Sequence, residues 1–261
     1  MARVIRMKPK HEQNKIPWDH PHLPPPPFRL VINAQSGSGK TNLLANLLRK
    51  EFYGDYFAPD HVHVFSNSLF TDPLWDLLPD ETLAESEDCL DKDILESIVA
   101  EATADVEKEG KTKANARLII ADDCIMEIYN RGKPDIMEKF YIRLRHVNCS
   151  IVITAQEYML LPKPIRINTT GLILFKINNM KEILAIWREH GGLLDRYTFM
   201  SILADVWKKP YSFLFLDFTQ PFGEHMRREF GPYIPLPKNF FLPQSDQNTN
   251  ERVAKRQKKK K

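Results

Sequence analysis

Phe28-Arg-Leu-Val-Ile-Asn-Ala-Gln-Ser-Gly-Ser-Gly-Lys-Thr41 is the stretch of sequence that decides the fold. Its first part, residues 28–33, is a short apolar run with β-branched side chains, typical of a buried parallel strand. Residues 34–41 have the spacing of a phosphate-binding P-loop, G-x-x-x-x-G-K-[ST], with alanine at the first glycine. Leucines at helical spacing then predict a helix over residues 40–50. Strand, loop and helix in this order predict an α/β fold that binds a nucleotide.

The residue types at most positions of the loop can be explained by the chemistry of phosphate binding. Gly37 and Gly39 let the backbone turn its N–H groups inward, which forms a nest for phosphate oxygens at a helix N-terminus. Lys40 can reach the β- and γ-phosphates, and the Thr41 hydroxyl can bind Mg²⁺. The sequence therefore predicts ATP and Mg²⁺ as ligands. The residues expected to hold the nucleotide are Ala34, Gln35, Ser36, Gly37, Ser38, Gly39, Lys40, Thr41 and Asn42.

The rest of the chain alternates strands with helices, which predicts a three-layer α/β sandwich with a mainly parallel sheet covered on both faces. One further segment, residues 222–228, is expected to be a helix packed on the sheet. The apolar runs that predict strands are residues 61–66, 117–121, 149–154, 171–175 and 211–217, and the helical patterns are residues 91–109, 136–146, 179–189 and 193–207.

Two carboxylates follow the predicted strand at 117–121. Asp122 is placed to bind Mg²⁺, directly or through water, at the end of this strand. Asp123 is the candidate to orient or deprotonate the attacking water. A strand that merely ends in a solvated Asp-Asp turn is the alternative. The P-loop upstream favours a hydrolytic pair.

A glutamine follows the strand at 149–154. The carboxyl ends of parallel strands share one edge, where ligands bind, so Gln156 is expected near the γ-phosphate. Its amide can accept a hydrogen bond from the attacking water and donate one to a phosphate oxygen. The alternative is an ordinary residue of a loop or of a helix start.

These elements, in this order, resemble the FtsK–HerA superfamily of P-loop ATPases, which pump DNA as ring oligomers. The chain is most similar to the virus-type genome-packaging ATPases of the poxvirus kind, over about residues 28–230. The closer resemblance rests on Arg145-His146, which leads into residues 149–156, and on residues 161–168. The resemblance implies a RecA/ASCE-like P-loop NTPase fold.

The resemblance also implies an arginine finger that acts across a subunit boundary. A guanidinium can neutralise charge that develops on the γ-phosphate. Arg145 and Arg166 are the candidates, and Arg143 is a weaker third; the sequence does not choose between the first two. Each of them could instead be a surface ion-pair residue.

Composition and charge divide the chain into three parts. Residues 1–27 form a basic, proline-rich arm, residues 28–243 the ATPase domain, and residues 244–261 a polar tail that is expected to be disordered. The last ten residues carry seven Lys and Arg residues and no acid, although the net charge of the whole chain is only +3. This tail could contact DNA phosphates, act as a nuclear import signal, or have no role.

The composition gives no indication of a membrane or secreted protein. No stretch approaches the roughly 18 to 20 apolar residues that a membrane span requires. The N-terminus lacks the apolar run of a secretory signal, and the three cysteines have neither disulfide nor zinc spacing. We expect a soluble protein of a reducing compartment.

The expected function is Mg²⁺-dependent ATP hydrolysis coupled to the movement of double-stranded DNA into a preformed viral capsid. The resemblance implies a homo-oligomeric ring of five or six subunits and contact with capsid proteins, in the virion or in the nucleus or cytoplasm of the host cell, at the virus factory. A cellular or plasmid DNA pump is the alternative within the superfamily. A nucleotide-gated assembly or scaffold protein is an alternative of another class.

Overall fold

The computed structural model of this 261-residue chain shows an α/β domain. It describes residues 18, 20–78, 82, 87, 90–124, 128, 136–192 and 194–236. The predicted tail and most of the predicted arm lie outside these residues. In the part of the chain that is described, no helix is long and apolar enough to cross a membrane.

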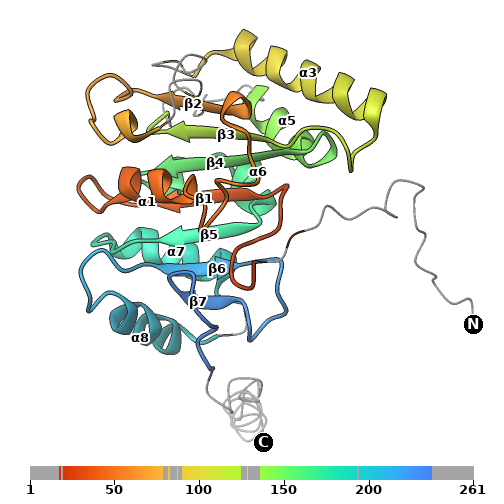
Figure 1. The fold of residues 1–261 in the computed structure, drawn as a ribbon. Coiled ribbons are helices and arrows are strands. Elements are labelled where there is room, and N and C mark those ends of the chain that lie inside the picture. The colour runs from red at the N-terminus through yellow and green to blue at the C-terminus, as the bar shows by residue number, and fades with distance from the viewer. Residues whose placement is uncertain are drawn as a thin grey trace, which may run out of the picture.

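The central sheet of the described residues has seven strands in the order β2-β3-β4-β1-β5-β6-β7 (Figure 1). Strands β2 to β5 pair in parallel, and β6 and β7 are antiparallel to their neighbours. This confirms the mainly parallel sheet. The strands are β1 (Arg29–Asn33), β2 (Val62–Ser66), β3 (Arg117–Asp122), β4 (Cys149–Ala155), β5 (Gly171–Leu174), β6 (Leu214–Asp217) and β7 (Met226–Arg228).

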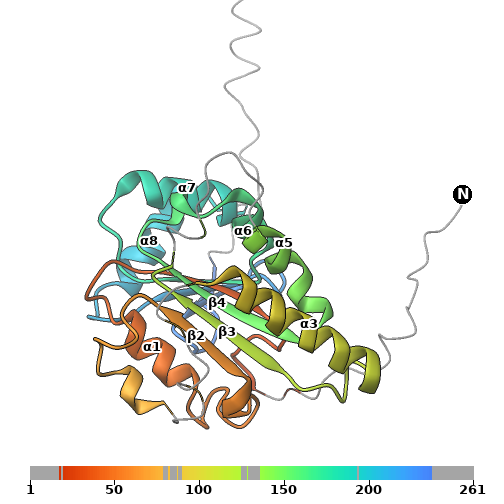
Figure 2. The ribbon, with the colours of Figure 1, turned by 90° about the horizontal axis from the view of Figure 1, so that it is seen from above.

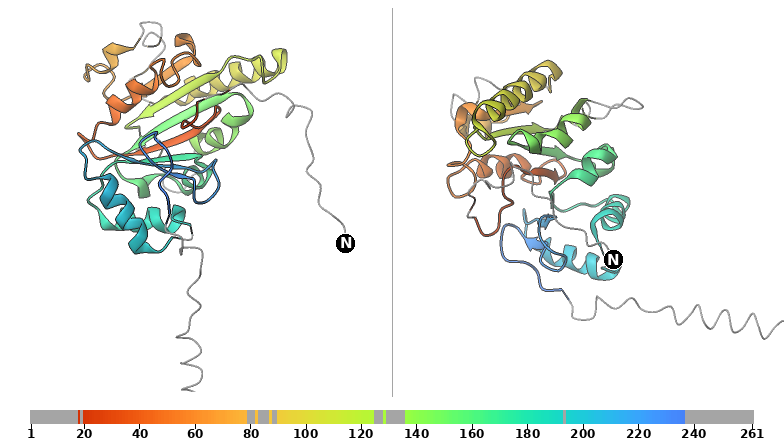
Figure 3. Two further views of the ribbon diagram at one scale, coloured as in Figure 1. Left: turned by 60° about the horizontal axis from the view of Figure 1, so that its bottom comes forward. Right: turned by 90° about the vertical axis from the view of Figure 1, so that its right-hand side faces the viewer.

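Helices cover both faces of the sheet. Helix α1 lies on one face, and α3, α5, α6, α7 and α8 lie on the other, as the view from above and the edge-on view show (Figures 2 and 3). The three-layer sandwich is therefore confirmed. The helices are α1 (Lys40–Leu47), α3 (Lys92–Glu109), α5 (Ile136–Arg143), α6 (Lys163–Asn168), α7 (Met180–His190) and α8 (Arg196–Val206), and the short 3₁₀ turns are η2 (Pro59–His61), η3 (Trp75–Leu77), η4 (Leu144–His146) and η5 (Tyr158–Leu160).

Two hydrophobic clusters lie on opposite faces of the sheet. Successive side chains of a strand point to opposite faces, so Val31 joins the cluster under α3 and α5–α8, and Ile32 joins the cluster under α1. Every residue of β1 to β6 is buried, as expected of strands covered on both sides.

The segment after β6 differs from the sequence expectation. A helix over residues 222–228 was wrong, because residues 226–228 form strand β7 and pair with β6. This pairing satisfies backbone groups of β6 that would otherwise lie at an open sheet edge. The preceding strand is also shorter than expected, since it begins at Leu214 and Tyr211 adopts a positive φ of 62° that no strand residue has.

The end of the predicted arm packs on the domain. Leu23 is only 4% exposed and belongs to the cluster under α1. The Tyr53 hydroxyl donates to the carbonyl of Pro24 at 2.9 Å, and the Trp18 ring stacks on Tyr53. Trp18 and Leu23 therefore contribute to the same core as the P-loop helix.

Candidate nucleotide site

The P-loop connects β1 to α1 at the carboxyl edge of the sheet. Ala34 is fully buried, and its backbone N–H donates to the carbonyl of Ala155 at 3.0 Å. The side-chain amide of Asn33 donates to the same carbonyl at 3.1 Å. These two bonds hold the start of the loop against the end of β4, beside β3.

Two glycines give the loop its shape. Gly37 and Gly39 have φ values of 74° and 94°, in the region that glycine adopts without a Cβ clash. Gly39 also caps the N-terminus of α1, where no side chain accepts a hydrogen bond from the described helix N–H groups. The loop and the first turn of α1 line a cavity of about 370 Å³, which we call the phosphate cavity. Unpaired N–H groups and the helix dipole favour an anion here.

Six of the nine residues predicted to bind the nucleotide line this cavity. Its walls come from Ser36, Gly37, Gly39, Lys40, Thr41 and Asn42, with Ser68, Asp72, Leu74 and Asp123 opposite. Gln35 and Ser38 stabilise the turn itself, because the Ser38 N–H donates to the carbonyl of Gln35 at 3.1 Å. The side chain of Gln35 also accepts a bond from Asn178 at 3.3 Å, which ties the loop to the segment before α7.

Asp122 ends β3 and is fully buried. Its Oδ1 accepts from the Thr154 hydroxyl at 2.7 Å, and its Oδ2 accepts from the Ser66 hydroxyl at 3.1 Å. Lys40 Nζ lies 3.5 Å from Oδ1. Burial raises the pKa of Asp122, and the Lys40 ammonium and the Thr154 hydroxyl act in the opposite direction. The carboxylate is thus oriented by two hydroxyls and partly neutralised by the P-loop lysine.

Asp123 leaves the strand in the left-handed region, with a φ of 55°. Its backbone N–H donates to the Thr154 hydroxyl at 2.9 Å, and its carbonyl accepts from the Asn67 amide at 3.0 Å. These bonds hold a conformation that Asp tolerates better than most residues. They direct the carboxylate to Lys40, which it contacts, and to Gln156, whose Nε2 lies 3.4 Å from Oδ1.

Thr154 is a site residue that the sequence analysis missed. Its hydroxyl donates to Asp122 and accepts from the N–H of Asp123, so one side chain orients both carboxylates. It is fully buried at the end of β4. Only the parallel register of β3 and β4, which pairs Ala121 with Ile153, places Thr154 beside Asp122. In the sequence, the only sign of this role is that the threonine stands just before Ala155 and Gln156, at the end of a predicted strand.

The structure does not bring the candidate arginines to this cluster. Arg145 lies in η4, before the amino end of β4, and its side chain is exposed. Arg143, at the end of α5, is exposed as well. The seven residues of β4 separate Arg145 from Gln156 by about 20 Å at the usual rise per strand residue.

Arg166 is engaged within its own subunit. Its guanidinium pairs with Glu189 of α7 and lies over the Tyr158 ring, 5.3 Å from the ring centre. The Tyr158 hydroxyl lies 2.7 Å from Glu189 Oε2 and 2.6 Å from His190 Nε2. These contacts join the segment after Gln156 to α7.

The donor set of the phosphate cavity suits Mg²⁺. Thr41, Ser68, Asp72 and Asp123 line the cavity, and Asp122 lies next to Lys40. These side chains offer hydroxyl and carboxylate oxygens, the ligands that Mg²⁺ prefers. In the described part of the chain, no group of three or more His, Cys, Asp or Glu residues suits a metal ion.

Comparison with solved structures shows a shared fold. The genome packaging NTPase B204 from Sulfolobus turreted icosahedral virus 2, in complex with AMP, is 14% identical, with a TM-score of 0.54, over 81% of this chain and 99% of that one. The DNA-packaging ATPase B204 from Sulfolobus turreted icosahedral virus is 15% identical, with a TM-score of 0.52, over 81% and 99%. EssC (ATPases 2 and 3) from Geobacillus thermodenitrificans is 17% identical, with a TM-score of 0.53, over 88% of this chain and 43% of that one.

Comparison at the level of sequence identifies the family. No protein with a curated description matches the chain. The sequence model of the family described as Poxvirus A32 protein matches residues 17–214, which is more than half of the chain and includes the P-loop, both aspartates and Gln156. The chain therefore belongs to the poxvirus A32 protein family, the family of packaging ATPases that its motifs resemble.

Proposed function

We propose that this ATPase hydrolyses ATP with Mg²⁺ and uses the free energy to move double-stranded DNA into a viral capsid. One observation carries the proposal. Lys40 of the P-loop lies against Asp122 and Asp123, and Asp123 lies within reach of Gln156. A phosphate site, a carboxylate pair and a polar amide from three neighbouring strands thus meet at one sheet edge, as nucleotide hydrolysis requires.

The P-loop holds the phosphates. Ser36, Gly37, Gly39, Lys40 and Thr41 line the phosphate cavity, and Lys40 contacts both Asp122 and Asp123. When the triphosphate binds, its charge competes with the carboxylates for the lysine ammonium. Phosphate binding therefore changes the environment of Asp123, the residue that we assign to the attacking water.

Thr41 and Asp122 are the residues that would hold Mg²⁺, the aspartate directly or through water. The ion would neutralise charge on the β- and γ-phosphates. The Thr154 and Ser66 hydroxyls hold the Asp122 carboxylate in one orientation. The Asp122 carboxylate could then bind Mg²⁺, directly or through water, without a change in its orientation.

Asp123 and Gln156 are assigned to the attacking water. The Asp123 carboxylate is 27% exposed, so water can reach it, whereas the Asp122 side chain is fully buried. Asp123 would accept a proton from the water, and the Gln156 amide would orient that water against the γ-phosphate. The contact between these two side chains supports a shared task.

A ring of identical subunits, five or six by family resemblance, would complete the site. Arg145 is exposed at the sheet edge opposite the phosphate cavity, so it can serve only the site of a neighbouring subunit. Supplied in this way, its guanidinium would stabilise the charge that develops during hydrolysis. Capsid proteins would hold the ring at the portal of entry, within the virus factory of the host cell.

The proposal is tested by steady-state ATP hydrolysis with and without duplex DNA. Wild-type turnover should rise when duplex DNA is added, and Lys40→Ala should abolish it under both conditions. Turnover that is indifferent to DNA would remove the motor function and leave a nucleotide-gated assembly role. Turnover that survives in Lys40→Ala would remove the assignment of the P-loop as the hydrolytic site.

A further inference from the structure

Three cationic side chains and a histidine gather at the amino edge of the sheet, opposite the phosphate cavity. Arg29 begins β1, Lys111 follows α3, and Arg145 and His146 lie in η4. The charges of the three cations all act on His146. In the part of the chain that the structure describes, none of the three pairs with a carboxylate. The function assigned to Arg145 leaves the role of its neighbours open.

Lys111 restrains the backbone at Arg145. Its Nζ donates to the carbonyl of Arg145 at 2.6 Å. The segment that carries Lys111 is itself fixed to the start of β4. There the Asn148 side-chain amide donates to the carbonyl of Ala114 at 2.9 Å, and the Arg117 N–H donates to the carbonyl of Asn148 at 3.1 Å. A hydrogen bond from an ammonium is stronger than one between neutral groups, so Lys111 holds η4 in place.

His146 restrains the side chain of Arg145. The Arg145 Nε donates to His146 Nε2 at 3.2 Å. Arginine has no acceptor, so this imidazole nitrogen accepts the bond and carries no proton. Among the described residues, the terminal guanidinium nitrogens of Arg145 have no hydrogen-bond partner. One N–H therefore orients the guanidinium, and the N–H groups at its end stay available for a ligand.

Arg29 sets the charge around this contact. It is only 7% exposed, its guanidinium lies 5.8 Å from the centre of the Tyr141 ring, and its Nε and NH1 have no partner among the described residues. Burial and the charges of Arg145, Lys111 and Arg29 lower the pKa of His146. His146 is therefore mainly neutral at pH 7, in the form that accepts a hydrogen bond from Arg145.

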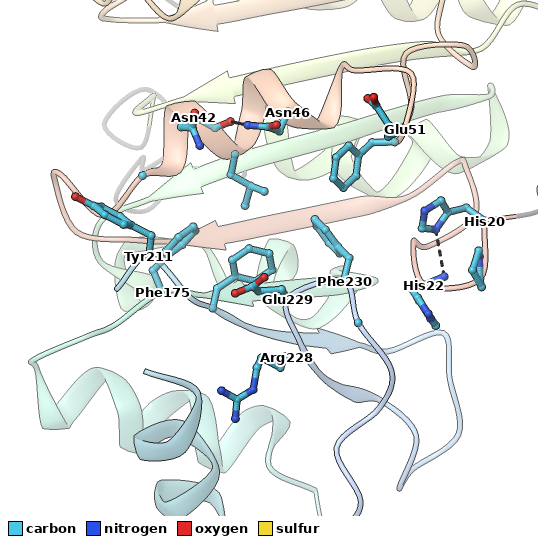
Figure 4. A pocket seen from close by; sticks show the side chains of 16 residues that line it. His20, His22, Asn42, Asn46, Glu51, Phe175, Tyr211, Arg228, Glu229 and Phe230 are labelled. Atoms are coloured by element: carbon cyan, nitrogen blue, oxygen red, sulfur yellow. Dashed lines mark hydrogen bonds between the residues drawn. The ribbon is translucent and has the colours of Figure 1, made fainter. Parts of the chain in front are cut away.

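A second contact between an arginine and a histidine shows what differs at Arg145. Arg227 NH1 lies 3.3 Å from His22 Nδ1 and also donates to the carbonyl of Gly231 at 3.2 Å. Arg227 is buried, and His22 is one of the side chains around the cavity between α1 and β7 (Figure 4). That arginine uses a terminal nitrogen within its own subunit. Arg145 is exposed and uses only its Nε, which fits a group that meets a ligand from outside.

We propose that Lys111 and His146 are positioning residues for Arg145, which they hold by its carbonyl and its Nε so that its terminal nitrogens meet the γ-phosphate in a neighbouring subunit. The inference rests on the proposed function, because it requires Arg145 to act across the subunit boundary. It adds a pH dependence, since a proton on His146 removes the acceptor and places a further positive charge beside Arg145. The charged groups that face His146 are Arg29 of β1, Lys111 after α3 and Arg145 itself.

Steady-state hydrolysis and equilibrium ATP binding by the full chain test the two contacts. His146→Ala should lower kcat about 10- to 100-fold with ATP affinity unchanged, since a misplacement of about 1 Å costs that much. His146→Gln keeps an acceptor oxygen and should recover most of the activity. Lys111→Met keeps the stem without the ammonium and should lower kcat, and Lys111→Arg should restore it. His61→Ala removes a histidine of η2, at the same edge of the sheet, and is the matched control.

Two further readouts separate positioning from a general loss of structure. A residue that acts only through Arg145 has no effect once that arginine is gone, so Arg145→Ala with His146→Ala should be as active as Arg145→Ala alone. The second readout is the pH profile. Wild-type kcat should fall as the pH drops below about 6.5, through the lowered pKa of His146, and His146→Gln should lack this fall.

Three results would overturn the inference. One is wild-type turnover in His146→Ala and Lys111→Met while Arg145→Ala is inactive. Another is a further loss of activity in the double variant, which would mean that His146 acts independently of Arg145. The third is a parallel fall of ATP affinity in the single variants, which would mean that they disturb the fold. If Arg145→Ala is as active as wild type, the proposed finger itself fails, and that one variant identifies this case.

Discussion

The two edges of the sheet differ in how their functional candidates are held. At the carboxyl edge, Lys40, Asp122 and Asp123 contact one another, and each has its orientation set by hydrogen bonds or ion pairs. At the amino edge, Arg145 is exposed, and its guanidinium donates to the adjacent His146 at 3.2 Å. Strand β4 runs from one edge to the other. A single strand can thus contribute to two nucleotide sites, one in its own subunit and one in a neighbour.

The contrast also separates the two candidate fingers. In the described part of the chain, Arg145 has no carboxylate partner, whereas Arg166 pairs with Glu189 and covers Tyr158. A finger that serves a neighbouring subunit must have a free guanidinium when that subunit docks. The geometry therefore favours Arg145, and Arg166 is better suited to hold the segment after Gln156 on α7.

The largest effect on activity is expected when Arg145, at the amino edge of the sheet, is removed. Arg145→Ala should lower kcat on the order of 10³-fold or more, with little change in ATP affinity, because the finger acts on the transition state. Steady-state hydrolysis and equilibrium ATP binding measure the two quantities. Arg196→Ala removes an exposed arginine of α8 that is not a candidate finger, and serves as the matched control.

Mixing two inactive variants sharpens this test. A ring that contains Arg145→Ala and Lys40→Ala subunits has some interfaces with an intact P-loop on one side and an intact finger on the other. Activity should therefore return on mixing. Equal activity of Arg145→Ala and wild type would remove Arg145 as the finger and leave Arg166 and Arg143. No recovery in the mixture would mean that Arg145 does not act across the subunit boundary.

The second prediction concerns the carboxyl edge itself. Asp123→Asn keeps the shape of the side chain and removes the base, so kcat should fall about 10²- to 10⁴-fold. ATP affinity should stay within a few-fold of wild type, because Lys40 and the loop still bind the phosphates. Isothermal titration measures the ATP affinity, and steady-state hydrolysis measures kcat. Turnover near the wild-type value would assign the attacking water to another residue.

The third prediction removes the hydroxyl that orients both aspartates. Thr154→Val leaves a buried carboxylate and a backbone N–H without their partner, and the free energy of unfolding should fall by about 1–3 kcal/mol. Urea denaturation measures this loss. Thr154→Ser keeps the hydroxyl and should recover most of the stability. If the valine and serine variants are equally stable, the hydroxyl does not support the pair.

The fourth prediction concerns the network behind Gln156. Burial lowers the pKa of His190 to about 4, with Glu189 and Arg166 acting in opposite directions. Because the pKa in the unfolded chain is near 6.5, only the unfolded chain binds this proton between about pH 6.5 and 4. This contribution to stability is complete above pH 6.5 and is lost as the pH falls through that window.

His190→Gln removes the titrating group and serves as the test. Its unfolding free energy should fall less steeply between pH 6.5 and 4 than that of wild type, by at most about 1 kcal/mol per pH unit. Urea midpoints at a series of pH values give the two slopes. Parallel slopes would mean that His190 is not held neutral in the folded protein.

The smallest effect is expected at Ala34, which stands where the P-loop pattern has its first glycine. Ala34 is fully buried with an ordinary negative φ, so Ala34→Gly should leave ATP affinity within about 2-fold. It should lower stability by no more than ~1 kcal/mol, because glycine gains freedom in the unfolded chain. A tenfold change in ATP affinity would show that the alanine methyl shapes the phosphate cavity.

Much of the fold could be predicted from local pattern. The strand–loop–helix at residues 28–47 and the strand that ends in Asp122 lie where the apolar runs place them. Strand β7 could not be predicted, because residues 226–228 are a strand through their pairing with β6, a contact that the local sequence does not show. The strand expected to begin at Tyr211 begins at Leu214 instead, and the positive φ of Tyr211 is not visible in the local pattern.

The candidate site divides in the same way. Glycines, a lysine and a threonine at fixed spacing determine the phosphate loop by themselves, because the geometry of that loop is local. The contact of Lys40 with Asp122 spans 82 residues and follows from the order of the strands in the sheet. The sequence by itself therefore determined the nucleotide loop, the mainly parallel sheet and the residues that end its strands. Only the tertiary structure decided that Thr154 orients both aspartates, that Arg166 is held by Glu189 and that Arg145 lies at the sheet edge opposite the phosphate cavity. These relations depend on strand register and helix packing, which join residues far apart in the chain.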